Sequence, residues 1–129
     1  MLPFTVALRT GEPVYEQVVY AVRRAVVTGQ LRAGDAFPSV RDLSQALKIN
    51  PNTAHRIVAL LVDEGLLIVR PGVGTLVSDP ARADAPARRA VLEDEAERLV
   101  VNAKRKAIGL ADLLAAIRRH WSRTMRKGA

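Results

Sequence analysis

The sequence contains no cysteine and no long run of apolar residues. Without cysteine the chain has no disulfide framework, no thiolate metal site and no thiol nucleophile. Its longest apolar stretch, from Ile57 to Val62, is far shorter than the roughly 20 residues that a helix needs to span a bilayer. The opening residues, MLPFTVALRTGEP, lack the basic start and apolar core of a signal peptide. We therefore expect a cytoplasmic protein with no membrane partner.

The length of 129 residues suffices for one ordinary domain and a short appendage. We therefore expect no large ligand-binding domain. Hydrophobic residues make up 49% of the chain and charged residues 26%. This balance is typical of chains that bury a core and differs from that of disordered chains.

The formal net charge of +7 favours a polyanionic partner, because summed positive potential attracts phosphate before any specific contact forms. The charge is unevenly distributed. Residues 1–80 hold eight Lys and Arg against seven Asp and Glu, whereas residues 81–129 hold twelve against six. Since most of the excess lies in the last third, any binding site in the first two thirds must be argued from its local arrangement.

Three helices are predicted in the first half of the chain. The first begins at a proline that suits a first helical turn and ends at Gly29. The second follows Ser39, with Asp42 three residues later in a near-match to a capping box. The third follows Asn50, a favourable N-cap, with Pro51 at its first position. Apolar residues recur at helical spacing in all three: Val14, Val18, Val22, Ala25 and Val26; Leu43, Ala46 and Leu47; and Ala54, Ile57, Val58 and Leu61.

A β-hairpin and two further helices are predicted after the third helix. Leu66–Arg70 and Thr75–Ser78 are short apolar runs joined by a turn that contains Gly72 and Gly74, a pattern typical of a wing. Beyond a segment rich in Pro and Ala, Gly109 separates two helical patterns. The predicted fold is mainly α with a small β-hairpin: a winged helix-turn-helix over residues 1–78, a linker over 79–89, a two-helix dimerisation element over 90–122 and a basic tail over 123–129.

The start of the third helix carries the candidate nucleic-acid contacts. In a helix-turn-helix, the second helix of the pair enters the major groove and its N-terminal residues meet base edges. Asn can form two hydrogen bonds with adenine, and Thr can bond a base or contact the thymine methyl group. Unpaired N–H groups at the helix start and glycines at a wing tip suit contact with phosphate. The predicted DNA-binding residues are Ser39, Arg41, Asn50, Pro51, Asn52, Thr53, His55, Arg56, Gly72, Gly74 and Thr75.

The last third of the chain carries an apolar face on both sides of Gly109. Two helices after a linker bury little by themselves. Pairing with a second copy is therefore favoured over an intramolecular core, in line with the two-fold symmetry of most homo-oligomers. The residues predicted at this interface are Leu92, Leu99, Val100, Ala103, Leu113, Leu114, Ile117 and Trp121.

Each feature also has a simpler explanation. Asn50 can serve only as the N-cap of the helix, and Arg41 can be a solvated charge without a DNA contact. The acidic residues between 93 and 97 fit the solvent-exposed face of a helix better than a role in acid–base chemistry. The two histidines, His55 and His120, lie in different elements, so no zinc site is indicated. With no nucleophile, base and orienting group in view, we expect neither an enzyme nor a cofactor or metal.

Several short motifs resemble the winged helix of the GntR superfamily of bacterial regulators. They are PSVRDL (38–43), NPNT (50–53), DEGL (63–66) and GVGT (72–75). NPNT, together with the short segment after the wing, is similar to the YtrA-like branch, whose C-terminal helices mediate dimerisation. The family's wing usually has Lys or Arg between its two glycines, whereas this chain has Val73. The resemblance implies repression of transcription and DNA contacts by Arg41, Asn50, Asn52, Thr53, His55 and the tip glycines.

The resulting hypothesis is a homodimeric transcriptional regulator that binds a pseudo-palindromic double-stranded DNA operator. The family resemblance implies that it acts as a repressor. A first alternative is a non-specific architectural nucleic-acid-binding protein, favoured by the basic last third. A second is a winged helix that binds a protein through its third helix. The operator, the controlled genes, the sign of regulation and any small-molecule effector are not encoded in recognisable form.

Overall fold

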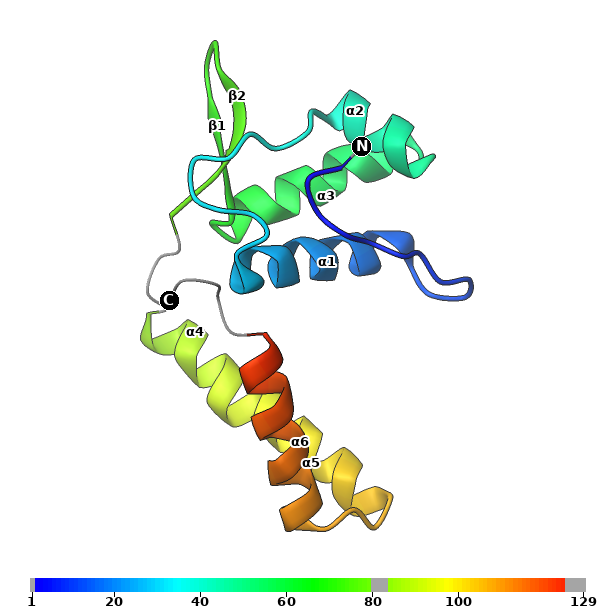
Figure 1. Ribbon diagram of the computed structural model, residues 1–129, viewed down its shortest axis with the longest axis vertical. Helices are drawn as coiled ribbons and strands as arrows, with labels where there is room; N and C mark the ends of the chain where they lie inside the picture. Colours follow the sequence, from blue (N-terminus) through cyan, green and yellow to red (C-terminus); the bar gives the residue numbers. More distant parts are fainter. Residues whose placement is uncertain (1, 80–83, 125–129) are drawn as a thin grey trace. The chain divides into compact units, whose positions relative to one another are not determined.

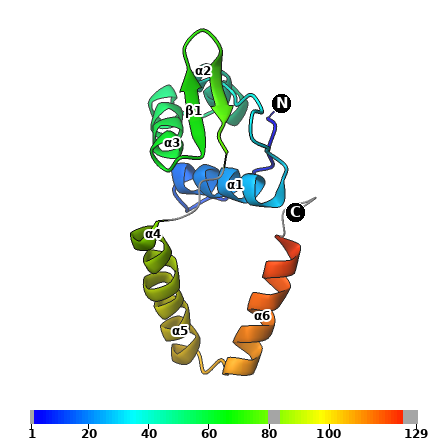
Figure 2. The same ribbon diagram turned by 90° about the vertical axis from the view of Figure 1, so that its left-hand side faces the viewer.

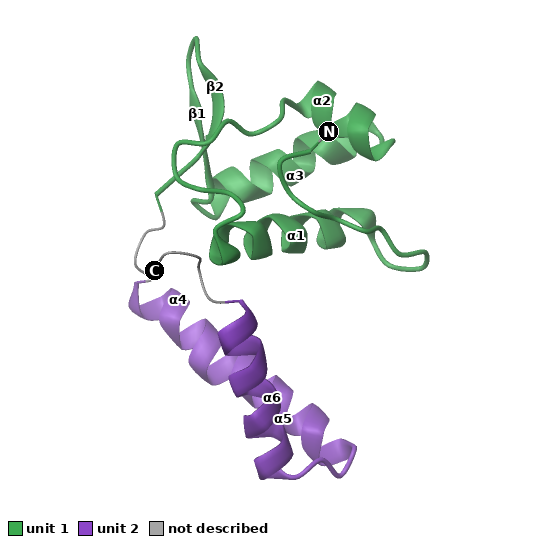
Figure 3. Ribbon diagram, in the orientation of Figure 1, with its two compact units in different colours: residues 1–80, 125–129 green, residues 81–124 purple. Residues whose placement is uncertain are grey.

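The computed structural model describes residues 2–79 and 84–124 (Figure 1). They form two compact units, coloured separately in Figure 3. The first unit contains helices α1 (Val14–Thr28), α2 (Val40–Leu47) and α3 (Pro51–Asp63), followed by strands β1 (Leu67–Arg70) and β2 (Gly74–Val77). The predicted fold class, mainly α with a small hairpin, is confirmed.

The helices of the first unit begin and end at the residues that the sequence pattern indicates. α1 ends at Gly29, whose φ of 83° lies in the left-handed region that glycine adopts at little cost. Ser39 caps α2, because its Oγ accepts a hydrogen bond of 3.1 Å from the backbone N–H of Asp42. The C-cap of α2 is Lys48, also left-handed with a φ of 55°, and only Lys48, Ile49 and Asn50 separate α2 from α3. This tight turn joins α2 and α3 as a helix-turn-helix.

A single apolar core holds the three helices together. The rings of Phe4 and Phe37 stack with their centroids 5.7 Å apart, which ties the N-terminal segment to the loop before α2. Burying a Val, Leu or Ile side chain contributes about 1.5–3 kcal/mol, so this core accounts for much of the stability of the unit. The largest side chains that are almost fully buried are Leu31, Leu43, Ile57, Leu61, Val18 and Val22.

The hairpin is packed at its base and exposed at its tip. β1 and β2 pair antiparallel, with Leu67 opposite Val77 and both side chains only 2% exposed. The backbone N–H of Phe37 donates to the carbonyl of Thr75 at 2.8 Å, so the loop before α2 holds the second strand. Further out, Val69 is 57% exposed. The hairpin therefore projects from the core as a wing.

The second unit consists of two helical rods (Figure 2). The first rod is formed by α4 (Ala85–Arg89), the π-helical segment η1 (Ala90–Glu95) and α5 (Ala96–Arg105), which follow one another without a break. The second rod is α6 (Leu110–Arg123), and Figure 2 shows the two diverging from the loop that joins them. Among the described residues of this unit, Ala103 is the one buried side chain.

The start of the first rod differs from the sequence prediction. Helix α4 begins at Ala85, inside the segment 79–89 that was predicted as a linker. The reason is local: the side chain of Asp84 accepts a hydrogen bond of 2.9 Å from the backbone N–H of Ala87, and Pro86 lies in the first turn, where proline is tolerated. Residues 80–83 of the predicted linker and 125–129 of the predicted tail lie outside the described residues.

Candidate nucleic-acid interface

Helix α3 is capped by the residue that the sequence placed there. The side-chain oxygen of Asn50 accepts a hydrogen bond of 2.8 Å from the backbone N–H of Asn52, and Pro51 occupies the first helical position. The carbonyl of Asn50 also accepts from the N–H of Ala54 at 3.1 Å. Asn50 is therefore a structural cap, as its simpler interpretation expects, and its side-chain oxygen is occupied within the helix.

The residues after the cap divide between core and solvent. Ala54, Ile57, Val58 and Leu61 are buried. Asn52, His55 and Arg56 are exposed and Thr53 is half-buried. Because the buried positions recur every three or four residues, the polar ones at the helix start lie on the side away from the core. The first turns of α3 thus present hydrogen-bonding side chains to solvent.

Ala59 is an exposed residue of α3 that the sequence prediction does not include. It follows Asn52 by seven residues and His55 by four, so it lies on the same side of the helix. An exposed alanine at this place can approach the methyl group of a thymine. The helical spacing of the sequence already places Ala59 on this side of the helix, but an alanine has no polar group that would mark it as a DNA contact.

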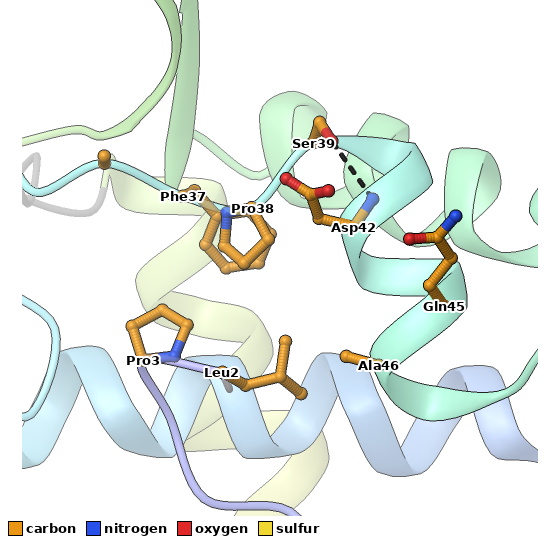
Figure 4. A pocket seen from close by; sticks show the side chains of 9 residues that line it. Leu2, Pro3, Phe37, Pro38, Ser39, Asp42, Gln45 and Ala46 are labelled. Carbon is orange, nitrogen blue, oxygen red and sulfur yellow. Dashed lines mark hydrogen bonds between the residues drawn. The ribbon is translucent and has the colours of Figure 1, made fainter.

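The start of α2 lies beside an open groove (Figure 4). Ser39, the N-cap of α2, and Asp42 and Gln45 of α2 line it together with Phe37 and Pro38. The N-terminal residues Leu2 and Pro3 form the opposite edge. Ser39 and Arg41, both predicted to contact DNA, are exposed at this end of the helix.

The wing tip has the backbone conformation that its glycines permit. Gly72 and Gly74 have φ values of 76° and 119°, in or near the left-handed region that other residues avoid. Between them Val73 is 69% exposed, and its N–H donates to the carbonyl of Arg70 at 3.0 Å. Thr75, predicted to contact DNA, is half-buried next to the tip. The wing therefore ends in an apolar side chain, with Arg70 as the nearest cation in sequence.

Arg56 makes a contact that the sequence did not predict. The central carbon of its guanidinium group lies 4.3 Å from the centroid of the Tyr15 ring, at the start of α1. Tyr15 is partly buried against the core. Nothing in the spacing of the sequence links residues 15 and 56, because the contact depends on how α1 packs against α3.

The second unit exposes most of the apolar side chains that were predicted at a dimer interface. Ala103 is buried and Leu113 is half-buried. Leu92 lies in η1, and since a π turn holds more residues than an α turn, its position on the rod is rotated relative to α5. The exposed fractions of the others are 55% for Leu92, 44% for Leu99, 41% for Val100, 39% for Leu114, 41% for Ile117 and 74% for Trp121. Val91, Val101, Ile108 and Leu110, which were not predicted, are exposed as well.

Two other classes of site have no candidate in the described part of the chain. Within residues 2–79 and 84–124, no group of three His, Asp or Glu side chains is placed to hold a metal ion. None of the helices in these same ranges is both long enough and apolar enough to cross a membrane.

Three helices, the last two joined by a tight turn and followed by a two-stranded hairpin, define a winged helix-turn-helix domain. The family model described as "Bacterial regulatory proteins, gntR family" matches residues 14–77. Through this domain the chain belongs to the GntR family, and it is a DNA-binding transcriptional regulator. The predicted family resemblance is confirmed.

The chain is also similar to individual members of the family. It is 27% identical over 106 residues to the HTH-type transcriptional repressor YtrA of Bacillus subtilis (strain 168), an alignment that covers 81% of this chain and 82% of YtrA. It is 32% identical over 73 residues to the uncharacterized HTH-type transcriptional regulator YhcF of the same organism, covering 57% of this chain and 60% of YhcF. The likeness to YtrA, predicted from the sequence, is confirmed.

Solved structures share the fold. A transcriptional antiterminator from Listeria monocytogenes EGD-e has a TM-score of 0.83 at 20% identity, covering 98% of this chain and 95% of that one. YtrA from Sulfolobus acidocaldarius, a GntR-family transcription factor, has a TM-score of 0.55 at 24% identity, covering 92% and 97%. At these identities the likeness concerns the fold alone.

Proposed function

We propose that this chain is a cytoplasmic, sequence-specific repressor that binds a pseudo-palindromic operator as a homodimer. The observation that carries the proposal is the exposed polar start of α3, where Asn52 and His55 point away from the buried face that anchors the helix. A helix of this kind, next to a projecting wing, is suited to lie in the major groove with its first turns against base edges. Repression is supported by the names of relatives such as YtrA.

The predicted DNA contacts have different roles in this proposal. Asn52 and His55 face the bases, and Thr53 lies beside them. Asn50 and Pro51 shape the start of the helix, whose positive end favours a phosphate. Ser39 and Arg41 meet the backbone from the start of α2. Gly72, Gly74 and Thr75 bring the wing backbone close to the DNA.

The homodimer is supported by the second unit. Its two helices leave large apolar side chains such as Leu99, Ile117 and Trp121 at least 41% exposed. Apolar surface of this kind marks an interaction site, and a second copy of the same helices offers a matching surface. Two recognition helices related by a two-fold axis then read half-sites about one helical turn apart, or a multiple of that distance.

Selection of duplexes from a random library by the full chain tests the proposal. Enrichment of a two-fold symmetric motif is the expected result. Recovery of duplexes without any common motif would instead support a non-specific architectural protein, for which the basic residues of 81–129 are the favouring observation. Failure to retain any duplex at moderate salt would support the protein-binding alternative.

A further inference from the structure

Helices α1 and α3 are joined by two arginine contacts that differ in what they leave available. Arg23 of α1 forms an ion pair with Glu64, next to the end of α3, and its Nε donates to Glu64 Oε2 at 3.0 Å. Arg56 of α3 instead lies over the ring of Tyr15. The first contact neutralises the arginine with a carboxylate. The second keeps the positive charge.

The contact with the Tyr15 ring, 4.3 Å from the guanidinium carbon to the ring centroid, leaves N–H donors of Arg56 available. An aromatic ring contacts the flat face of a guanidinium group, whereas its N–H donors point outward in the plane of that group. Among residues 2–79 and 84–124, no carboxylate forms an ion pair with Arg56. The side chain is exposed, so these donors face solvent.

The ring also fixes where the charge lies. Tyr15 is the second residue of α1 and packs against the core, so it is a rigid support for a side chain that would otherwise sample many rotamers. Arg56 follows Asn52 by one turn on α3. Its contact with Tyr15 places the guanidinium group beside α1, at the flank of α3.

We infer that Tyr15 is a positioning residue, which holds Arg56 so that its N–H donors bind a phosphate of the DNA backbone beside α3. The inference rests on the proposed function, since it requires α3 to lie in the major groove. It assigns Arg56 to the sequence-independent part of the interface. A phosphate at the edge of the groove fits a planar donor group that can bond two oxygens at once.

The test compares affinity and its salt dependence for five variants of the full chain, on the selected duplex and on a random duplex. Arg56→Gln is expected to weaken binding to both duplexes by the same factor, on the order of tenfold. It should also reduce the slope of log K against log salt by about 0.9 for each phosphate that the arginine neutralises. Tyr15→Leu should act in the same direction and by less, whereas Tyr15→Phe, which keeps the ring face, should bind like the wild type.

A matched control is available on the same helix. Tyr20 is 61% exposed on α1, and Tyr20→Leu should leave the affinity and the slope unchanged. In the double variant Tyr15→Leu with Arg56→Gln, the decrease in affinity should equal that of Arg56→Gln alone, because Tyr15 acts through Arg56. Thermal unfolding of each variant shows whether it is folded.

Three results would overturn the inference. The salt slope could stay unchanged in Arg56→Gln, the effects of the two single variants could multiply in the double variant, or Arg56→Gln could weaken the selected duplex alone, which is the sign of a base contact. In each of these cases the wild type still prefers the selected duplex, so the proposed function stands. If the wild type binds no duplex, both the proposed function and the inference about Arg56 and Tyr15 are refuted.

Discussion

The side-chain oxygen of Asn50 accepts a hydrogen bond of 2.8 Å from the backbone N–H of Asn52 at the start of α3. Two asparagines in the same motif therefore have different tasks. The first holds the helix start together, and the second, exposed one turn from the arginine that stacks on Tyr15, is directed to solvent.

Replacing the capping residue should affect folding. Asn50→Ala removes the acceptor for an N–H at the start of α3, so the free energy of unfolding should fall by about 1 kcal/mol. Chemical denaturation measures this change. Asn50→Asp keeps an acceptor oxygen at the same place and should retain most of the wild-type stability. Equal decreases in the free energy of unfolding of Asn50→Ala and Asn50→Asp would show that the side-chain acceptor oxygen contributes little to stability.

Replacing its neighbour should affect recognition. Asn52→Ala removes an exposed carboxamide and leaves the core intact, so the free energy of unfolding should change by less than about 0.5 kcal/mol. Binding to the selected duplex should weaken by about 1–3 kcal/mol, while binding to a random duplex should hold. Fluorescence anisotropy with both duplexes measures this. An equal loss of affinity for both duplexes would indicate that Asn52 contacts the DNA backbone and not the bases.

The wing tip should accept a charge. Val73 is 69% exposed between two glycines, so Val73→Lys should leave stability unchanged. If the tip approaches the DNA backbone, the new ammonium group should tighten binding to any duplex and steepen the salt slope by about 0.9 per phosphate. Val73→Ser serves as the uncharged control. An unaltered slope in Val73→Lys would mean that the wing stays clear of DNA.

The second unit should dissociate when its apolar surface is charged. Leu114 is 39% exposed on α6, and Leu114→Asp should convert a dimer into a single chain of 14.0 kDa, as sedimentation can measure. The single tryptophan, Trp121, is 74% exposed in the chain, so its emission should shift to longer wavelength as dimers dissociate.

Ala115→Asp is the matched control for this dissociation, because it adds the same charge at an exposed position one residue further along α6. It should remain a dimer. A wild-type chain that sediments at 14.0 kDa over the whole concentration range would refute the dimer.

The sequence predicted the first unit well because its boundaries depend on local chemistry. Gly29, Ser39 and Asn50 each cap a helix through their own backbone or side chain, so their positions could be recognised without knowledge of the packing. The same holds for the wing, where glycines mark the turn. The polar start of α3 followed from the spacing of its buried residues.

Features that depend on packing or on unusual helical geometry could not be predicted. The contact between Tyr15 and Arg56 joins residues 41 positions apart and exists only because α1 packs against α3. The π-helical segment η1 has no signature in the apolar spacing, which fits an uninterrupted α-helix. Helix α4 was predicted as part of a linker because its alanines and proline show no apolar period. Its start depends on a single cap, from Asp84.

The ratio of two equilibrium constants tests the central claim most directly. The full chain is titrated with the selected two-fold duplex and with a duplex of the same length and composition in scrambled order, at physiological salt. If the first turns of α3 read base pairs, the selected duplex should bind at least about 10³-fold more tightly. A ratio near one would show that the exposed start of α3 does not recognise sequence.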